Sequence, residues 1–164
     1  MKKIFLFLLL YCFILNGCAA KRISEDQHQG DYQAAKAAFM RGDYAESIRL
    51  LRPLADQGDP EAQQLLGGFY ENGEGVPQDF AEAAKWYRKA AEQGSAQGQA
   101  NLGFMYAMGR GVSKNNVLAY MWLELAAAKG NADAMLNRRN VAAQMTPDEI
   151  KQAQRLAKEW KPTR

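Results

Sequence analysis

A block of 36 residues occurs twice in succession in this chain. Residues 61–96 align without a gap to residues 97–132, and thirteen aligned positions are identical. Most of the identical positions hold small, aromatic or turn-forming residues, such as the glycines at 67 and 103. A period of about 20–50 residues is typical of arrays in which each unit packs against its neighbours. The chain is therefore predicted to be a stacked repeat array, a class that presents a surface more often than it encloses a reaction.

Apolar spacing and glycine punctuation predict that each repeat is a helical hairpin. In residues 61–96 we expect a first helix over 61–71, a glycine-rich loop over 72–78 and a second helix that ends before Gly94. Residues 97–132 follow the same plan. No strand-like alternation occurs in the sequence, so the fold class predicted is all-α.

Two further helical units flank the repeated block. Residues 31–60 predict a shorter hairpin, with apolar residues at helical spacing that include Phe39 and a tight Arg-Gly-Asp-Tyr turn. Pro53 lies inside its second helix and is expected to kink it. Residues 133–164 predict a pair of capping helices, the second of which starts with a well-marked Thr146-Pro147-Asp148-Glu149 sequence.

Carboxylates stand at the predicted helix starts. Asp43 and Asp79 are placed to cap helices, and Glu46 and Glu82, three residues later, would complete capping boxes. Asn115 replaces the aspartate in the second copy. These carboxylate-rich turns are interpreted as helix caps rather than as a calcium site.

Small residues at identical positions predict close helix packing. A side chain at Gly67 or Gly103 would hold neighbouring helices apart, and the alanines of the second helices are expected to act in the same way. The paired loop glycines, Gly73 with Gly75 and Gly109 with Gly111, allow positive φ. Val76 and Val112 are expected to fix each loop to the core.

The first 17 residues predict an export signal. Lys2 and Lys3 precede an unbroken apolar run over residues 4–15, which is too short for a transmembrane helix. The run ends in Leu15-Asn16-Gly17-Cys18, which resembles the lipobox of bacterial lipoproteins. The resemblance implies cleavage before Cys18 and acylation of this residue, for example with palmitate. An ordinary secretory signal with an incidental cysteine is the alternative interpretation.

The lipoprotein resemblance also implies a location. Ala19 follows the cysteine, where an aspartate would favour retention in the inner membrane, so the outer membrane facing the periplasm is expected ahead of the inner membrane or the cell surface. Residues 18–30 would be the lipidated N-terminus and a flexible tether. The region after residue 17 has a net charge near +1 and no basic run, so no nucleic-acid partner is expected.

The repeat itself resembles a known family. The string L-G-x-x-Y-x-x-G-x-G-V-P-x-D followed by A-x-x-W-Y-x-K-A-A-E-Q-G, over residues 66–94, is similar to the Sel1-like repeat, a relative of the tetratricopeptide repeat. Residues 102–130 fit the same pattern with Ser113 and Leu123 at two positions. The hairpin over residues 31–60 is more similar to a tetratricopeptide repeat. The resemblance implies a right-handed α-solenoid with a C-terminal helical cap.

The inventory of reactive residues argues against an enzyme. The single histidine, His28, lies in the predicted tether, where a metal or acid–base role would need partners that it lacks. Neither a Ser-x-x-Lys nor a Gly-x-Ser-x-Gly sequence occurs, and the glycine-rich loops lack the lysine of a phosphate-binding loop. No metal and no cofactor other than the covalent lipid on Cys18 are expected.

The remaining candidate site is a surface. In tetratricopeptide-type arrays the first helix of each repeat lines the concave face, and this resemblance implies nine candidate partner-binding residues: Tyr32, Lys36, Met40, Gln64, Gly68, Glu71, Phe104, Ala107 and Met108. Phe104 and Met108, one helical turn apart, are the expected apolar anchor for a peptide or helix. The alternative is that these side chains fill the seam with the C-terminal helices.

Three functions are compatible with this sequence. The first is a lipid-anchored, non-catalytic adaptor that binds a partner protein or peptide on the concave face. The second is an envelope enzyme of the β-lactamase-like or peptidoglycan-acting type, and the third is a purely structural accessory subunit of an envelope assembly. The sequence favours the first.

Overall fold

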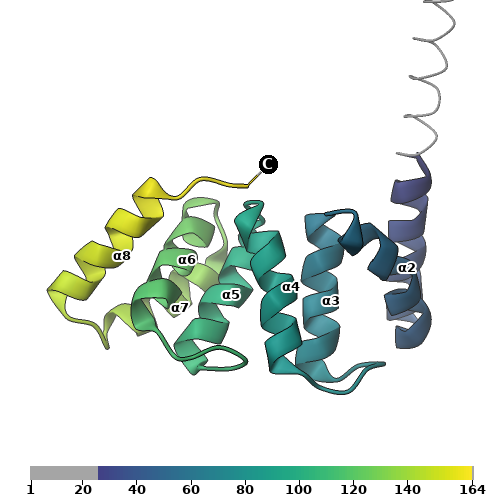
Figure 1. Ribbon diagram of the computed structural model, residues 1–164, viewed down its shortest axis with the longest axis horizontal. Coiled ribbons are helices and arrows are strands. Elements are labelled where there is room, and N and C mark those ends of the chain that lie inside the picture. The colour runs from purple at the N-terminus through teal and green to yellow at the C-terminus, as the bar shows by residue number, and fades with distance from the viewer. Residues whose placement is uncertain (1–25, 164) are drawn as a thin grey trace, which may run out of the picture.

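The chain is a row of antiparallel helices that follow one another along the long axis of the molecule (Figure 1). The computed structural model describes residues 26–163, and within this range every regular element is a helix. A helix over residues 26–40 comes first. It is followed by α2 (Tyr44–Asp56), α3 (Pro60–Asn72), α4 (Phe80–Glu92), α5 (Ala96–Met108), α6 (Asn116–Ala128), α7 (Ala132–Ala142) and α8 (Pro147–Glu159). The all-helical repeat solenoid predicted from the sequence is confirmed.

Each helix from α2 to α8 follows a residue whose side chain accepts a hydrogen bond from the first turn. Asp59, Ser95 and Asn131 cap α3, α5 and α7 and lie 36 residues apart, and Asp79 and Asn115 cap α4 and α6 at the same interval. Capping satisfies backbone N–H groups that have no partner within the helix. The 36-residue period of the sequence therefore includes the positions at which helices start. The interpretation of Asp43 and Asp79 as helix caps is confirmed.

Two of the three predicted capping boxes are half formed. Thr146 and Glu149 form the reciprocal pair at the start of α8. Glu46 and Glu82 instead bind Arg49 and Lys85, at 2.7 Å and 2.9 Å, on the following turn of their helices. A lysine or arginine three residues on competes for the glutamate side chain, which the box pattern alone does not take into account.

Glycines allow the close packing that the sequence predicted. A Cβ at Gly67 would lie 2.5 Å from the Tyr87 ring, and one at Gly103 would lie 2.7 Å from Leu123 Cγ. The loop glycines Gly73, Gly75, Gly109 and Gly111 all have positive φ, as expected. Val76 and Val112 pack against the core from their loops.

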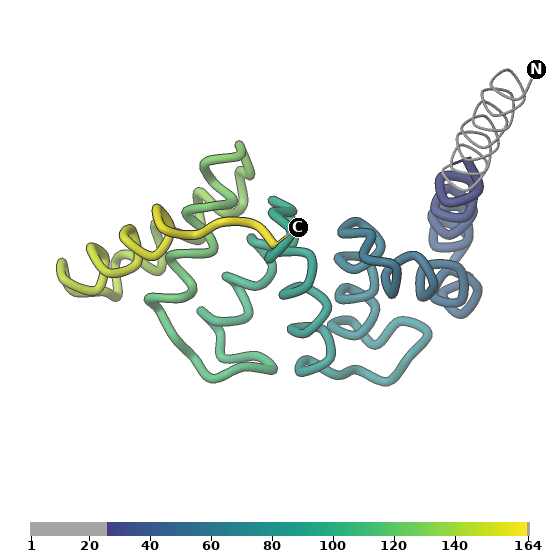
Figure 2. The backbone as a smooth tube through the Cα atoms, turned by 45° about the horizontal axis from the view of Figure 1, so that its top comes forward, coloured from purple at the N-terminus to yellow at the C-terminus, as the bar shows by residue number. Residues whose placement is uncertain are grey.

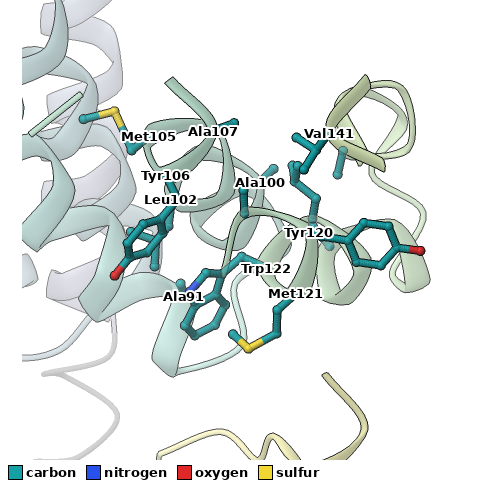
Figure 3. Packing of buried hydrophobic residues seen from close by; sticks show 14 of the residues in the cluster. Ala91, Ala100, Leu102, Met105, Tyr106, Ala107, Tyr120, Met121, Trp122 and Val141 are labelled. Atoms are coloured by element: carbon teal, nitrogen blue, oxygen red, sulfur yellow. The ribbon is translucent and has the colours of Figure 1, made fainter. Parts of the chain in front are cut away.

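Two hydrophobic clusters meet at α4. One cluster joins residue Ala35 with α2 and α3 and includes Trp86 of α4. The other extends from Tyr87 of α4 through α5 and α6 to Ala153 of α8, and Figure 3 shows part of its packing. Adjacent residues of α4 thus point into different clusters, so α4 is the wall that they share.

The C-terminal helices do not form a simple pair. Helix α7 packs on α5 and α6, whereas α8 packs mainly against α6. Beyond α8 the chain runs back toward α4 (Figure 2), where Thr163 N–H donates to Glu92 O at 2.8 Å. Trp160 lies 5.9 Å from the Trp122 ring, centroid to centroid. Helix α8 and residues 160–163 therefore lie across α6 and the end of α4, and we call this segment the C-terminal strap.

Three expectations about the N-terminal region are corrected or lie beyond the described residues. Residues 26–30, the first that the structure describes, are helical and not part of a flexible tether. The signal peptide over residues 1–17, Cys18 and the remainder of the tether lie outside the described residues. Helix α2 continues through Pro53, which is exposed.

Candidate binding groove

The first helices of the hairpins form one continuous face, which we call the first-helix face. It is made by the helix over residues 26–40, α3, α5 and α7, and α5 contacts both α3 and α7. Three hollows lie along it. This arrangement follows from the 36-residue period, since every hairpin places its first helix on the same side.

The hollow at the N-terminal end, here the N-terminal cavity, is apolar and has a volume of about 330 Å³. Its lining consists of Tyr32, Lys36, Phe39, Met40, Ser47, Leu65 and Phe69. Phe39 and Met40 are 44% and 84% exposed, which is unusual for side chains of this size and polarity. The ring of Phe39 packs at 5.6 Å against Phe69 and at 5.7 Å against Tyr44. The cavity wall is therefore fixed by aromatic contacts, while Met40 projects into solvent.

Lys36 is the only charged residue that lines the N-terminal cavity. Its Nζ lies 5.7 Å from the centroid of the Tyr32 ring. Burial, followed by the Glu61 and Asp59 carboxylates, raises the pKa of Tyr32 above its ordinary value, so this hydroxyl stays neutral. The cavity thus combines an apolar interior with one cation at its edge.

A smaller middle hollow adjoins the N-terminal cavity. It has a volume of about 90 Å³ and shares Phe39, Leu65 and Phe69 with its neighbour. Gln64, Gly68, Asn72 and Glu74 complete its lining. The shared residues make the two hollows one continuous depression.

The C-terminal cavity, of about 250 Å³, lies between α5 and α7 and reaches the end of α3. It is lined by Glu71, Gln97, Ala100, Asn101, Phe104, Asp133, Leu136 and Asn137. Three neutral amides and two carboxylates therefore surround an apolar floor. Arg110 stacks at 5.7 Å over the Phe104 ring but does not line the cavity, and Arg138 is paired with Glu124.

Glu71 is held in place by a buried partner. The Tyr87 hydroxyl donates to Glu71 Oε2 at 2.7 Å, and Tyr87 is 2% exposed. Burial, with a further contribution from Glu71, raises the pKa of Tyr87, so the phenol remains a donor. In the next repeat the same two positions are Ala107 and Leu123, so this fixed carboxylate occurs in one repeat only.

The structure brings seven of the nine predicted binding residues to these hollows. Tyr32, Lys36 and Met40 line the N-terminal cavity, Gln64 and Gly68 the middle hollow, and Glu71 and Phe104 the C-terminal cavity. Ala107 is buried, at 6% exposure. Met108 is 53% exposed but lines none of these hollows, so the structure does not bring it together with Phe104 in one site.

Sequence reasoning missed residues at both ends of the face. Phe39 was not singled out as a binding residue, and neither were Asp133, Leu136 and Asn137. A further shift by 36 residues would have found these last three, because they correspond to Gln97, Ala100 and Asn101 of the preceding repeat. Of the three, only Asn137 keeps the residue of the preceding repeat.

His28 has a partner that the sequence did not suggest. Its Nε2 lies 2.6 Å from Asp59 Oδ2, while Asp59 Oδ1 accepts from Ala62 N–H at the start of α3. The hollow beside it is lined by Gln27, His28, Asp31, Leu54 and Gln57, and holds no serine, threonine or cysteine. The contact joins the first helix to α3.

Neither membrane-spanning nor metal-binding groups are found in the residues described. Among helices within residues 26–163, none has the length and apolar character needed to cross a bilayer. Over the same range no three His, Cys, Asp or Glu residues come together in a way that could hold a metal ion.

Comparison with known proteins identifies the class to which this fold and face belong. The model of the Sel1 repeat matches residues 33–59, 60–95 and 96–131. The chain therefore belongs to the Sel1 repeat family, as its sequence suggested. The hairpin expected to be closer to a tetratricopeptide repeat is matched as a Sel1 repeat as well, despite its short turn.

Solved structures agree with this assignment. A protective antigen of uropathogenic Escherichia coli that displays an SLR fold superposes with a TM-score of 0.77 at 29% identity, covering 81% of this chain and 29% of that one. A Sel1 repeat protein from Oxalobacter formigenes gives 0.65 at 32% identity, over 79% of this chain and 56% of that one.

A shorter relative matches over less of this chain. Cysteine-rich protein B of Helicobacter pylori gives a TM-score of 0.54 at 25% identity, over 66% of this chain and 92% of that one. A search of curated proteins found no match. The chain thus spans less than two thirds of the length of the first two structures.

Sel1 repeat proteins are typically protein-interaction modules and are generally not catalytic. The family does not depend on a cofactor. The geometry of the first-helix face is consistent with an interaction module, since it offers hollows lined by apolar side chains and neutral amides.

Proposed function

We propose that this protein is a non-catalytic adaptor that binds a segment of a partner protein along the first-helix face. The observation that carries the proposal is the series of three hollows on that face, two of which share residues. Hollows of about 330 and 250 Å³ suit individual side chains of a peptide better than they suit a large substrate. Repeat arrays use such continuous faces to bind extended segments.

The adaptor is proposed to be tethered to the outer membrane and to face the periplasm. Support comes from the sequence Leu15-Asn16-Gly17-Cys18 after an apolar run, and from Ala19. Two or more acyl chains on one residue bind a bilayer far more firmly than a single chain does.

The binding face is tested by substitutions on opposite sides of the array. Phe104→Asp and Met40→Asp place charges in the two larger hollows, and Lys85→Asp changes an exposed residue of α4 that lies outside them. We expect the first two variants to lose a partner recovered from cells after affinity purification, with unchanged helical circular dichroism, and the third to retain it. Equal recovery with all three folded variants would contradict the proposal.

The anchor is tested separately. Cys18→Ser should abolish labelling by a fatty-acid analogue and move the protein from the membrane fraction to the soluble periplasmic fraction. A variant that remains in the membrane fraction would show that the lipoprotein assignment is wrong, without affecting the binding face.

A further inference from the structure

The two ends of the first-helix face differ in chemistry, and this difference restricts what can bind. At the N-terminal cavity Phe39, Met40, Leu65 and Phe69 form an open apolar surface. Its volume lies at the lower end of the range of about 300–1,000 Å³ that is usual for small-molecule binding sites. A methionine beside an aromatic ring adapts to ligands of different shape. This end therefore fits one bulky apolar side chain.

The other end is acidic. Glu71 and Asp133 line the C-terminal cavity, Glu74 lines the middle hollow, and no lysine or arginine lines either one. The chain as a whole has a net charge of +3, so the lining of these two hollows is more negative than the molecule as a whole. The hydrogen bond from Tyr87 fixes Glu71 before any ligand arrives, which reduces the entropic cost of binding.

The acidic residues alone would not define a site, since Asp133 is also an ordinary acidic residue in the first turn of α7. What defines the occupant is the position of these carboxylates on the same face as a large apolar cavity. Among the residues that line the hollows, the charged ones are Lys36 in the N-terminal cavity, Glu74 in the middle hollow, and Glu71 and Asp133 in the C-terminal cavity. An extended ligand is therefore complementary in charge only if its positive charge lies at the end that enters the C-terminal cavity.

We propose that the partner is an extended peptide segment with a large apolar side chain at one end and a lysine or arginine at the other. The apolar side chain occupies the N-terminal cavity, and the basic group lies in the C-terminal cavity between Glu71 and Asp133. This proposal rests on the function proposed above and adds the chemistry of the segment bound.

The experiment uses a random peptide library displayed on phage and selected on the immobilised full chain at low ionic strength. Enriched peptides should combine an aromatic or large aliphatic residue with a lysine or arginine at a fixed separation. One enriched peptide is then synthesised together with a version in which glutamine replaces the basic residue, and both affinities are measured by fluorescence anisotropy.

Matched variants assign the effect to the residues named. For Glu71→Gln and Asp133→Asn we expect the preference for the basic peptide to fall about two- to fivefold each, as for an exposed ion pair. Asp148→Asn, in the equivalent first turn of α8, should leave the preference unchanged. Met40→Ser should weaken both peptides equally, whereas Met135→Ser, an exposed methionine outside the hollows, should weaken neither.

The two proposals fail in different ways. Enrichment of acidic peptides, or a basic preference that survives Glu71→Gln combined with Asp133→Asn, would overturn the assignment of the ligand while the adaptor function stands. A selection that enriches no peptide on the wild-type chain would overturn it as well. The adaptor function itself fails only if no cellular partner depends on the first-helix face.

Discussion

Gly111 lies where two successive hairpins come into closest contact. Its φ is +65°, and a Cβ built on it would lie 2.6 Å from Ala81 N and still closer to the carbonyl group of Phe80, at the start of α4. Gly75 occupies the equivalent place one repeat earlier and approaches Tyr44, at the start of α2. Each long loop therefore rests on the second helix of the preceding hairpin. A glycine is required there both for the backbone conformation and for the space.

Comparison of Gly111→Ala with Gly42→Ala separates the cost of the backbone conformation from the cost of the steric clash. Gly42 also has positive φ but has nothing within 4 Å of its Cβ position, so Gly42→Ala should cost only the conformational penalty of about 1–2 kcal/mol. Gly111→Ala adds a clash with backbone atoms, and we expect a loss of about 3 kcal/mol or more. The free energy of unfolding in urea checks this, and equal losses for the two variants would contradict the packing described.

Two buried glutamines at equivalent positions differ in how well they are satisfied. Gln63 Nε2 donates to Ala55 O at 3.0 Å, and its Oε1 accepts from Gln93 at 2.8 Å. Gln99 donates to Ala91 O at 3.2 Å, but its buried Oε1 has no partner among the described residues. Both join the first helix of a hairpin to the end of the second helix before it.

Leucine replaces each glutamine at similar volume. Gln63→Leu removes two hydrogen bonds between helices, while Ala55 O still accepts from Gly58 N–H and Gln93 Nε2 still donates to Lys89 O. A loss of about 1–3 kcal/mol in the free energy of unfolding is expected. Gln99→Leu also removes an unsatisfied acceptor, so the loss should be about 1 kcal/mol or less. Denaturation of both variants measures the difference, and a larger loss for Gln99→Leu would show that the environment of its oxygen is misjudged.

Links between elements follow the same 36-residue interval. Arg52 of α2 donates to the Tyr70 hydroxyl of α3 at 2.6 Å, and Arg88 of α4 donates to the Tyr106 hydroxyl of α5 at 2.5 Å. One period later the position holds Glu124, which pairs with Arg138 instead. Between α6 and α7 the link is therefore an ion pair between Glu124 and Arg138, in place of the hydrogen bond from arginine to tyrosine of the earlier hairpins.

The strap depends on a few contacts of Trp160. The indole packs against Trp122 and lies 5.5 Å from Lys129 Nζ, whose pKa is lowered by burial. Trp160→Ala should destabilise the C-terminal half by about 2–4 kcal/mol, less than a fully buried tryptophan because the side chain is only partly buried. Lys161→Ala, at an exposed neighbour, is the control. Thermal denaturation with equal midpoints for the two variants would argue against the strap.

The sequence predicted the features that depend on local chemistry. Caps such as Asp79, and loop glycines such as Gly109, act within a few residues of the chain, so their patterns could be interpreted directly. The packing of α8 on α6 could not be predicted, because the apolar stripe of a helix does not say which neighbour covers it. For the same reason the spacing of apolar residues in the first helix did not show that Phe39 is 44% exposed.

The candidate face was predicted in part. Repeat geometry identified Tyr32, Lys36 and Phe104, since every first helix turns the same side outward. The fixed carboxylate of Glu71 could not be predicted to bind Tyr87, because these residues are 16 positions apart on different helices. Identical residues describe the scaffold, and the residues that differ between repeats determine the chemistry of the face.

At the scale of the whole molecule, the same helical scaffold repeats along the array, whereas the two ends of the first-helix face differ in chemistry. Helix α4 is shared by both hydrophobic clusters, so the hairpins on either side form one continuous body. The N-terminal cavity is lined by residues of the first described helix, on the side of the proposed lipid anchor, and the C-terminal cavity is lined by residues of α5 and α7. A partner bound along this face would be held near the membrane by the proposed anchor.

Photocrosslinking in living cells tests this account most directly. A photoreactive amino acid is placed at Phe104 or Met40 on the first-helix face, and at Lys85 on α4 as the matched exposed control. We predict that the two probes on the face capture the same partner protein and that the control probe does not. Capture of the same partner with equal yield from all three positions, or no capture from the face, would contradict the claim that this protein is an adaptor that binds through its first helices.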